Sequence, residues 1–153
     1  MNVDELRAHI CEKHPDLCPL FSIDYGDGTV QVAPEELHSA AKDLKELGFD
    51  ALAMVTAVDT GDVFTLVYRL TSIGLGAAVY LKADVPRGDP EIDSLCDLWP
   101  AANWQEREVY DLFGVAFMGH PNLRRILLSD DWEGHPLRKD YEDASMIRRP
   151  DYI

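Results

Sequence analysis

Residues 51–81 read ALAMVTAVDTGDVFTLVYRLTSIGLGAAVYL, and this stretch decides the fold class of the 153-residue chain. It contains three apolar runs that have the length and the β-branched content of strands. The runs cover 51–58, 63–70 and 75–81. Short connections at 59–62 and 72–74 contain the turn-forming residues Asp, Ser and Gly. Because consecutive strands with short loops pair in antiparallel fashion, the stretch predicts an antiparallel meander.

Helical patterns flank this meander on both sides. Before it, Pro34 opens a helix with a 3.6-residue apolar period, and Gly48 is suited to end it. The apolar stripe of this helix consists of Leu37, Ala40, Ala41, Leu44 and Leu47. The remaining predicted elements are a helix at 3–10, strands at 20–23 and 30–32, and helices at 91–98 and 102–113. This order predicts an α+β fold: a two-layer domain whose antiparallel meander sheet is covered by helices.

Beyond Gly114 the hydrophobic periodicity disappears, which predicts a domain at 1–114 followed by an extended docking tail at 115–153. Basic residues come in adjacent pairs in this tail, and aromatic residues accompany them. These residues are Arg124-Arg125, Arg138-Lys139, Arg148-Arg149, Trp132, Tyr141 and Tyr152. Arginine and aromatic residues are enriched where interfaces are anchored, so we interpret the tail as an arm that docks on a partner. The alternative is a solvated tail that folds back on its own domain.

The formal net charge of −14 disfavours two classes of partner. Affinity for nucleic-acid phosphates comes mainly from Lys and Arg, so the chain is a poor general nucleic-acid binder. Direct binding to anionic lipid is disfavoured for the same reason. The uncharged stretch from Leu70 to Leu81 is about half of the ~20 residues that a membrane-spanning helix needs, and the first residues contain no apolar signal core. We therefore expect a cytoplasmic chain that meets a membrane only through partners.

The three cysteines, Cys11, Cys18 and Cys96, do not form a metal-binding pattern. An iron–sulfur cluster usually needs four thiolates, and a structural zinc site needs four Cys or His ligands. We interpret the three as free structural thiols. A Cys11–Cys18 bridge is the alternative, although a reducing compartment disfavours it.

The densest cluster of functional side chains covers 106–113. Its carboxylates Glu106, Glu108 and Asp111 are candidates for a general acid–base pair. An ion-pair network around Arg107 is the structural interpretation, and we favour it because no nucleophile accompanies the carboxylates. Val109, Leu112 and Phe113 have the helical spacing of an inward-facing stripe.

His120 and His135 are the candidate metal ligands of the tail, with Asp130, Asp131 and Glu133 nearby in the sequence. No short spacing places the two histidines on one helix face. We favour histidines that form hydrogen bonds in turns over histidines that bind a metal.

The stretch from Glu106 to Tyr141 resembles the signature of the 30 kDa subunit of respiratory complex I, which in bacteria is the C subunit of NADH–quinone oxidoreductase. The matching residues are Glu106-Arg107-Glu108, Asp111-Leu112-Phe113, His120, Arg124, Ile126-Leu127 and the run from Asp130 to Tyr141. The chain departs from the family at Glu142, where relatives commonly have Pro.

The resemblance implies a cofactor-free scaffold subunit in the peripheral arm of a proton-translocating complex, on the cytoplasmic side of the cell membrane. The implied partners are the large subunit that lines the quinone cavity and the iron–sulfur subunits, and flavin and clusters are expected in partner subunits. The network of Glu106, Arg107, Glu108 and Asp111 would organise the helix and the tail. Arg124, Arg125, Arg138 and Lys139 would contact acidic groups of neighbours, Trp132 and Tyr141 would be apolar anchors, and His120 belongs to the matched signature.

Three alternatives remain open at this point. The first is the equivalent subunit of a related complex: a photosynthetic ferredoxin-dependent complex, a deazaflavin-dependent dehydrogenase or a membrane-bound hydrogenase. The second is an independent enzyme that uses the carboxylates of 106–111 or a metal at His120 and His135. The third, a nucleic-acid binder, is disfavoured by the charge.

Overall fold

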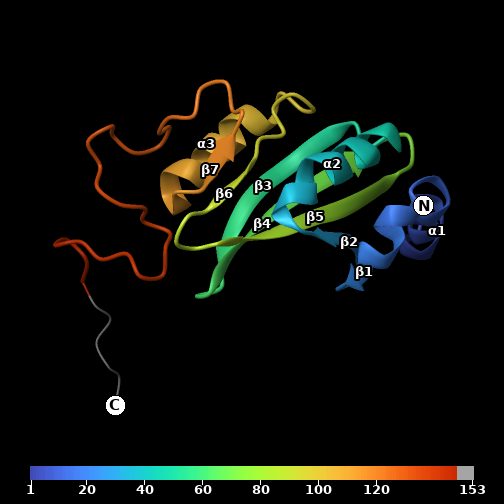
Figure 1. The fold of residues 1–153 in the computed structure, drawn as a ribbon, viewed down its shortest axis with the longest axis horizontal. Helices are drawn as coiled ribbons and strands as arrows, with labels where there is room; N and C mark the ends of the chain where they lie inside the picture. The colour runs from blue at the N-terminus through green and yellow to red at the C-terminus, as the bar shows by residue number, and fades with distance from the viewer. Residues whose placement is uncertain (148–153) are drawn as a thin grey trace, which may run out of the picture.

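A five-stranded sheet forms the centre of the computed structural model, which describes residues 1–147 (Figure 1). The spatial order of its strands is β1-β2-β5-β4-β3. The strands are β1 (Phe21–Asp24), β2 (Asp27–Val32), β3 (Ala51–Asp59), β4 (Val63–Ser72) and β5 (Ala77–Pro86). The predicted pair Arg148-Arg149 and the predicted anchor Tyr152 lie outside the described residues.

The predicted meander is confirmed, because β3 pairs with β4 and β4 pairs with β5 in antiparallel fashion. The meander is part of a larger sheet that also contains a parallel pair of strands. β2 pairs with β5 in parallel, and β1 is added to β2 as the outer strand of an antiparallel hairpin. The chain between β2 and β5 contains a helix and two strands, and a crossover of this kind allows parallel pairing. The sheet is therefore mixed, and its two halves are joined through a contact between strands distant in sequence.

One row of side chains across all five strands shows where the core lies. Val55, Tyr68, Leu81, Val30 and Phe21 are register neighbours from β3 to β1, and all five are buried. On β4 every second residue from Phe64 to Ser72 is buried, as expected for a strand with one face against a core. Burial of this apolar face supplies the main favourable term for folding.

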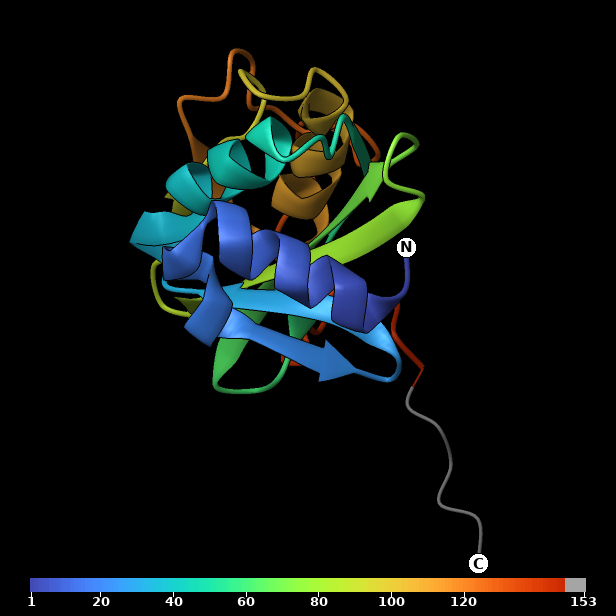
Figure 2. The same ribbon diagram turned by 90° about the vertical axis from the view of Figure 1, so that its right-hand side faces the viewer.

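Three α-helices lie on the core side of the sheet (Figures 1 and 2). They are α1 (Val3–Lys13), α2 (Leu37–Glu46) and α3 (Ala102–Phe113), and the short 3₁₀ segments η1 (Pro15–Leu20) and η2 (Pro34–Glu36) precede β1 and α2. The predicted stripe of α2 is confirmed at four positions, which are buried, whereas Leu47 is partly buried beyond the end of the helix. The α+β prediction with helices over the sheet is confirmed.

The predicted helix at 91–98 is wrong. Residues Glu91–Asp93 form a short strand, β6, which pairs in parallel with β7 (Ala116–Met118). Ile92, Leu95 and Trp99 have helical spacing, but Ile92 is buried in β6 and a turn follows, in which the N–H groups of Leu98 and Trp99 donate to the Leu95 carbonyl. Pairing with a strand that lies after α3 overrides the local period here.

The interpretation of Cys11 and Cys18 as free thiols is wrong, because the two form a disulfide. Cys11 lies in α1 and Cys18 in η1, which folds back beside that helix. Cys96 is a free thiol, as predicted.

The chain after Gly114 first contributes to the body. Val115 and Phe117 are buried, and β7 completes the small sheet with β6. Residues 119–147, the C-terminal segment, contain no helix or strand. The division at 114/115 as a boundary for docking stays a prediction. None of the helices within residues 1–147 combines the length and the apolar content that crossing a bilayer requires.

Candidate functional site at the end of helix α3

Helix α3 brings three charged side chains of the predicted cluster into buried positions. Glu106 and Asp111 are completely buried and Arg107 is 8% exposed, whereas Glu108 is exposed. Charged groups are seldom buried without partners, so each buried group indicates a set of specific contacts.

The Asp111 carboxylate binds the beginning of the C-terminal segment. Its Oδ2 atom accepts hydrogen bonds from three consecutive backbone N–H groups, of Ile126 (3.0 Å), Leu127 (2.8 Å) and Leu128 (2.9 Å). Its Oδ1 atom pairs with the Arg125 guanidinium at 2.7 Å. Burial by itself would raise the pKa of Asp111, but these donors outweigh it and lower the pKa to about 2. Asp111 is therefore ionised and organises residues 125–128.

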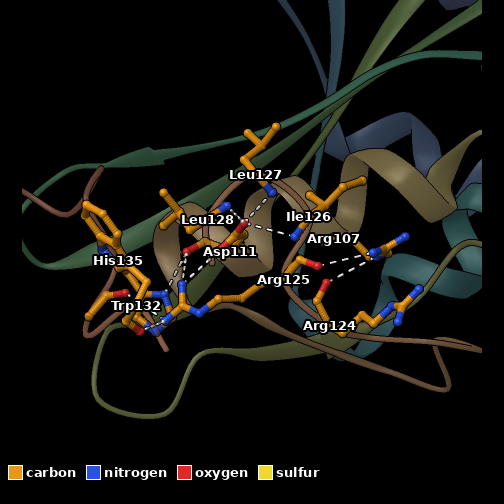
Figure 3. A network of polar contacts seen from close by, with 10 residues as sticks. Arg107, Asp111, Arg124, Arg125, Ile126, Leu127, Leu128, Trp132 and His135 are labelled. Carbon is orange, nitrogen blue, oxygen red and sulfur yellow. Dashed lines mark hydrogen bonds and ion pairs between the residues drawn. The ribbon is translucent and has the colours of Figure 1, made fainter. Parts of the chain in front are cut away.

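Arg125 connects the helix to the next part of the segment (Figure 3). Besides its ion pair, its Nη1 donates to the Asp111 carbonyl oxygen at 3.1 Å. Its Nη2 donates to the carbonyl oxygens of Trp132 and Gly134, both at 3.0 Å. Arg125 therefore has an internal role, and its contact with acidic groups of neighbouring subunits stays a prediction.

Arg107 binds backbone oxygens of the segment. Its Nε and Nη2 atoms donate to the carbonyls of Arg124 (3.1 Å) and Arg125 (3.2 Å) (Figure 3). The guanidinium carbon also lies 5.6 Å from the centroid of the Trp104 ring. Within residues 1–147 Arg107 makes no ion pair, so the prediction of an Arg107 ion-pair network is wrong. The side chain of Arg124 is exposed.

The C-terminal segment satisfies the last carbonyl groups of α3, which have no partner inside the helix. His135 Nδ1 lies 3.0 Å from the Asp111 carbonyl oxygen, the Leu137 N–H donates to Leu112 at 3.0 Å, and Arg138 Nε donates to Phe113 at 2.6 Å. A cation at this position is also favoured by the helix dipole. Residues 135–138 therefore cap the helix.

Gly114 makes this crossing possible. Its φ is +74°, the left-handed conformation that ends many helices. A Cβ atom at Gly114 would lie 2.5 Å from His135 Nε2 and 2.7 Å from Arg138 Nη2. The predicted end of the helix at Gly114 is confirmed. A glycine is required there also because the C-terminal segment packs closely against it.

A second attachment joins the segment to the edge of the sheet. The Lys139 N–H donates to Asp59 Oδ2 at 2.8 Å, and Arg87 pairs with both Asp59 (2.5 Å) and Asp140 (2.7 Å). The Lys139 hydrogen bond is the largest cause of the lowered pKa of Asp59. Arg87 and Arg138 also lie over the Phe64 ring, 5.2 and 5.1 Å from its centroid. Lys139 thus takes part through its backbone.

Glu106 is bound inside the body, and the groups that donate hydrogen bonds to it belong to residues 94–96. It accepts hydrogen bonds from Ser94 Oγ (2.6 Å), the Leu95 N–H (2.8 Å) and Cys96 Sγ (3.4 Å). Burial raises the pKa of Glu106. The three carboxylates of the predicted cluster are therefore in three different environments, one buried in the body, one exposed and one bound to the segment. They do not form an acid–base pair.

The two predicted histidines form separate hydrogen bonds, as the favoured interpretation predicts. His120 Nε2 lies 3.1 Å from the Asn103 carbonyl oxygen, and its Nδ1 accepts from the Asn122 N–H at 3.0 Å. His135 binds the end of α3 and lies edge-on to Tyr110.

Ligand atoms of His120, Cys96 and Glu106 lie within 4.8 Å of one another, which is a possible metal-binding group. Because Nδ1 of His120 accepts a backbone N–H, the neutral ring carries its proton on Nε2. A metal-binding histidine usually donates its second ring N–H instead, so this tautomer disfavours a metal.

Trp132 and Tyr141, the predicted anchors, line one hollow together with Asp131, Glu133 and Asp143. Sequence reasoning missed Asp59, Phe64, Arg87 and Ser94 as partners of the cluster. Asp59 and Arg87 offer only an isolated charge beside a turn, Phe64 is one apolar residue of a strand, and Ser94 carries no charge, so no pattern distinguishes them.

Comparisons with known proteins agree with these observations. The family described as "Respiratory-chain NADH dehydrogenase, 30 Kd subunit" matches residues 30–145. The C subunit of the NADH-quinone oxidoreductase of Geotalea uraniireducens is 46% identical over 129 residues, 82% of this chain and 79% of that protein. The same subunit of Trichlorobacter lovleyi is 49% identical over 132 residues, 83% of this chain and 82% of that protein.

Two solved structures are similar along most of the chain. A trypsin-resistant fragment (1–134) of Nqo5 has a TM-score of 0.64 and 31% identity, and the match covers 78% of this chain and 97% of the fragment. A chain of an archaeal membrane-bound sulfane sulfur reductase has a TM-score of 0.80 and 26% identity, covering 98% of this chain and 95% of that one. Sequence, structure and the buried signature residues of α3 agree, and the chain belongs to the family of the 30 kDa subunit of respiratory-chain NADH dehydrogenase.

Proposed function

We propose that the chain is a cofactor-free scaffold subunit in the peripheral arm of a proton-translocating NADH–quinone oxidoreductase. It supports electron transfer to quinone by holding neighbouring subunits in place, on the cytoplasmic side of the cell membrane. Its partners are the large subunit that lines the quinone cavity and the iron–sulfur subunits. The names of the relatives, which are C subunits of NADH-quinone oxidoreductases, support this proposal.

The docking role rests on one observation: some groups of the C-terminal segment are bound to the body, whereas others are exposed to solvent. Its backbone and the side chains of Arg125 and Arg138 are bound to α3 and to the sheet edge, while large apolar side chains remain exposed. These are Leu127, Trp132, Leu137, Met146 and Ile147. Exposed large apolar side chains are typical of interaction sites, and here they are held on a backbone that is already ordered.

The cysteines support a subunit without an iron–sulfur cluster of its own. Two of the three are joined in a disulfide, which leaves Cys96 as the single free thiolate donor. Burial raises the pKa of Cys96 to about 11, so it is a thiol at neutral pH. A cluster usually needs four thiolates, so this donor set does not fit one.

The equivalent subunit of a related membrane complex is the second candidate. The similarity to a chain of the sulfane sulfur reductase, over 98% of this chain, favours it specifically. The proteins that co-purify with the tagged chain from membranes in mild detergent distinguish the two. NADH-oxidising and flavin-containing subunits support the first, and their replacement by other electron-input subunits supports the second.

A truncation tests the docking role. A cut at residue 115 would remove β7 and the buried Phe117, so residues 129–153 are the better deletion because 125–128 stay bound to Asp111. We expect the truncated chain to fold, as judged by circular dichroism and cooperative unfolding, and to be absent from the purified complex. Recovery of the folded truncated chain in the complex at the full-length yield would refute the docking role.

A further inference from the structure

The hollow that contains Trp132 lies within the C-terminal segment and has a volume of about 390 Å³. Eight residues line it: Ser129, Asp131, Trp132, Glu133, Tyr141, Asp143, Ala144 and Ser145. Its walls are therefore formed by two stretches, 129–133 and 141–145, that face each other across a bend.

The bend is held by specific contacts. Arg125 binds the carbonyl groups of Trp132 and Gly134. Gly134 has a φ of +80°, and a Cβ atom there would lie 2.9 Å from the Tyr141 ring, so the ring packs directly on the Gly134 backbone. On the other wall Asp143 accepts from Tyr141 Oη at 3.0 Å and from the Ser145 N–H at 2.7 Å. Both walls are thus fixed by bonds within the chain.

The charge of the hollow is negative. It contains the carboxylates of Asp131, Glu133 and Asp143 and no basic side chain. Hydrogen bonds from serines, Ser129 to Asp131 and Ser145 to Asp143, are the main causes that lower the pKa values of both aspartates. None of the three carboxylates forms an ion pair within residues 1–147.

This combination favours an organic cation. Aromatic faces attract Lys and Arg side chains, and carboxylates at the rim add charge-assisted hydrogen bonds. An apolar side chain would desolvate three carboxylates without compensation, and an anion would be repelled. A bound metal ion is disfavoured because, within residues 1–147, no three ligand atoms of these carboxylates come within 4.8 Å of one another.

We propose that the Trp132–Tyr141 hollow receives a lysine or arginine side chain of a partner subunit. The proposal rests on the docking role proposed above and names the chemistry of its contact. Trp132 then acts as a wall that receives a cation, whereas the resemblance implies an apolar anchor. This places a basic group of the partner opposite an acidic hollow on a chain whose net charge is −14.

Neutralising the exposed carboxylates tests whether the negative charge of the hollow contributes to partner binding. The double variant Asp131→Asn/Glu133→Gln keeps the shape of the hollow, and Glu12→Gln/Asp27→Asn makes the same change of charge at exposed sites of the N-terminal half. The measurement is the dissociation rate of the tagged chain from the detergent-solubilised complex at increasing NaCl. We expect about tenfold faster dissociation at low salt for the hollow variant, with a weaker salt dependence, and no change for the control. Equal rates for both double variants would overturn the proposal.

Trp132 tests the aromatic face separately from apolar burial. Trp132→Phe keeps a ring, whereas Trp132→Leu keeps a large apolar side chain without one. A cation site requires Trp132→Phe to dissociate close to the wild-type rate and Trp132→Leu to dissociate about three- to tenfold faster. If Trp132→Leu behaves like Trp132→Phe, the residue is an apolar anchor and the proposal is wrong.

The partner side chain can be identified by zero-length carbodiimide coupling of the intact complex. A link from Asp131 or Glu133 to a partner lysine identifies lysine. Salt-sensitive dissociation without such a link identifies arginine, which carbodiimide does not couple.

If deletion of 129–153 abolishes assembly while all hollow variants match the wild type, the docking role stands and the cation site fails. If the truncated chain assembles, the docking role itself fails.

Discussion

Asp111 stabilises a stretch of chain that has no helix or strand of its own. A single carboxylate oxygen binds three consecutive N–H groups, at 126 to 128, and the other oxygen binds a guanidinium. Bonds to an ionised acceptor are stronger than bonds between neutral groups, so one buried side chain fixes four successive residues. The helix supplies the rigid base, and the segment supplies the donors.

Replacing Asp111 by Asn should therefore destabilise the protein by about 2–4 kcal/mol, because it leaves Arg125 without its charge partner and turns an amide donor toward either the backbone N–H groups or the guanidinium. Urea unfolding at pH 7 measures this loss. Asp111→Glu keeps the charge but not the reach of the carboxylate, and serves as the matched control, with a smaller loss.

The lowered pKa of Asp111 also predicts that the stability of the folded chain depends on pH. The pKa of Asp111 is lowered from 3.8 to about 2 in the folded chain, so its stabilisation is complete above the unfolded pKa and is lost as pH falls from about 4 toward 2. The shift corresponds to about 2 kcal/mol. The stability difference between wild type and Asp111→Asn should shrink over that interval, and a constant difference would contradict the assignment.

Sequence reasoning identifies the residues of this site more reliably than their partners. Glu106, Arg107 and Asp111 are recognisable because charged residues interrupt an apolar helical stripe. Apart from Arg125, which pairs with Asp111, their partners are backbone groups, Ser94 and Cys96, which have no charge that a pattern could match. The sequence therefore predicts an ion-pair network around Arg107, where the structure has Arg107 bound to main-chain carbonyl groups.

At the level of the secondary-structure elements, the end of α3 is the point where body and segment meet. Three successive carbonyl groups of the last turn, 111 to 113, are bound by His135, Leu137 and Arg138. Gly114 allows the crossing because it combines a positive φ with the absence of a Cβ atom.

Substitutions at two glycines separate the effect of backbone strain from the effect of lost packing. Gly114→Ala and Gly119→Ala both place a Cβ at a positive φ, +74° and +79°, but only the first meets other atoms. Backbone strain alone should cost about 1–2 kcal/mol at Gly119. Gly114→Ala should cost clearly more and should accelerate tryptic cleavage at Arg138, because residues 135–138 must leave the helix end. Thermal unfolding and timed proteolysis measure the two effects, and equal losses at both sites would contradict the packing role of Gly114.

The elements that sequence predicts correctly are those decided by local pattern: α1, α2, α3, β1, β2 and the three strands of the meander. The error at β6 and the unpredicted parallel pairing of β2 with β5 have one cause. Ile92 pairs with Phe117 and Val30 with Leu81, and such contacts between distant residues leave no trace in a local period. The Cys11–Cys18 bridge escapes sequence reasoning for a different reason, since it depends on η1 folding back along α1.

At the level of the whole molecule, Arg87 connects three parts of the chain. It follows β5, binds Asp59 at the β3–β4 hairpin and Asp140 in the C-terminal segment, and lies over the core ring of Phe64. The path of the segment across the body is thus fixed at two points, the helix end and this hairpin.

Arg87→Met should weaken the attachment of the C-terminal segment to the β3–β4 hairpin, while keeping an unbranched side chain on Phe64. We expect tryptic cleavage at Arg138 and Lys139 to become several-fold faster, with a loss of global stability of about 1–3 kcal/mol from the unpaired Asp59. Arg69→Met, which removes a guanidinium lying over Tyr80 outside any ion pair within residues 1–147, is the control. Identical cleavage rates for Arg87→Met and Arg69→Met would show that Arg87 does not hold the segment.

The capping of α3 by later residues has a consequence for synthesis. Arg125 to Leu128 follow Asp111 by 14 to 17 positions, so at about 5–20 residues per second they leave the ribosome within a few seconds of it. The C-terminal segment can acquire its shape only once α3 has folded to receive it. Under the proposed docking role, a misfolded copy would offer no shaped segment, and incorporation into the larger assembly would select for correctly folded chains.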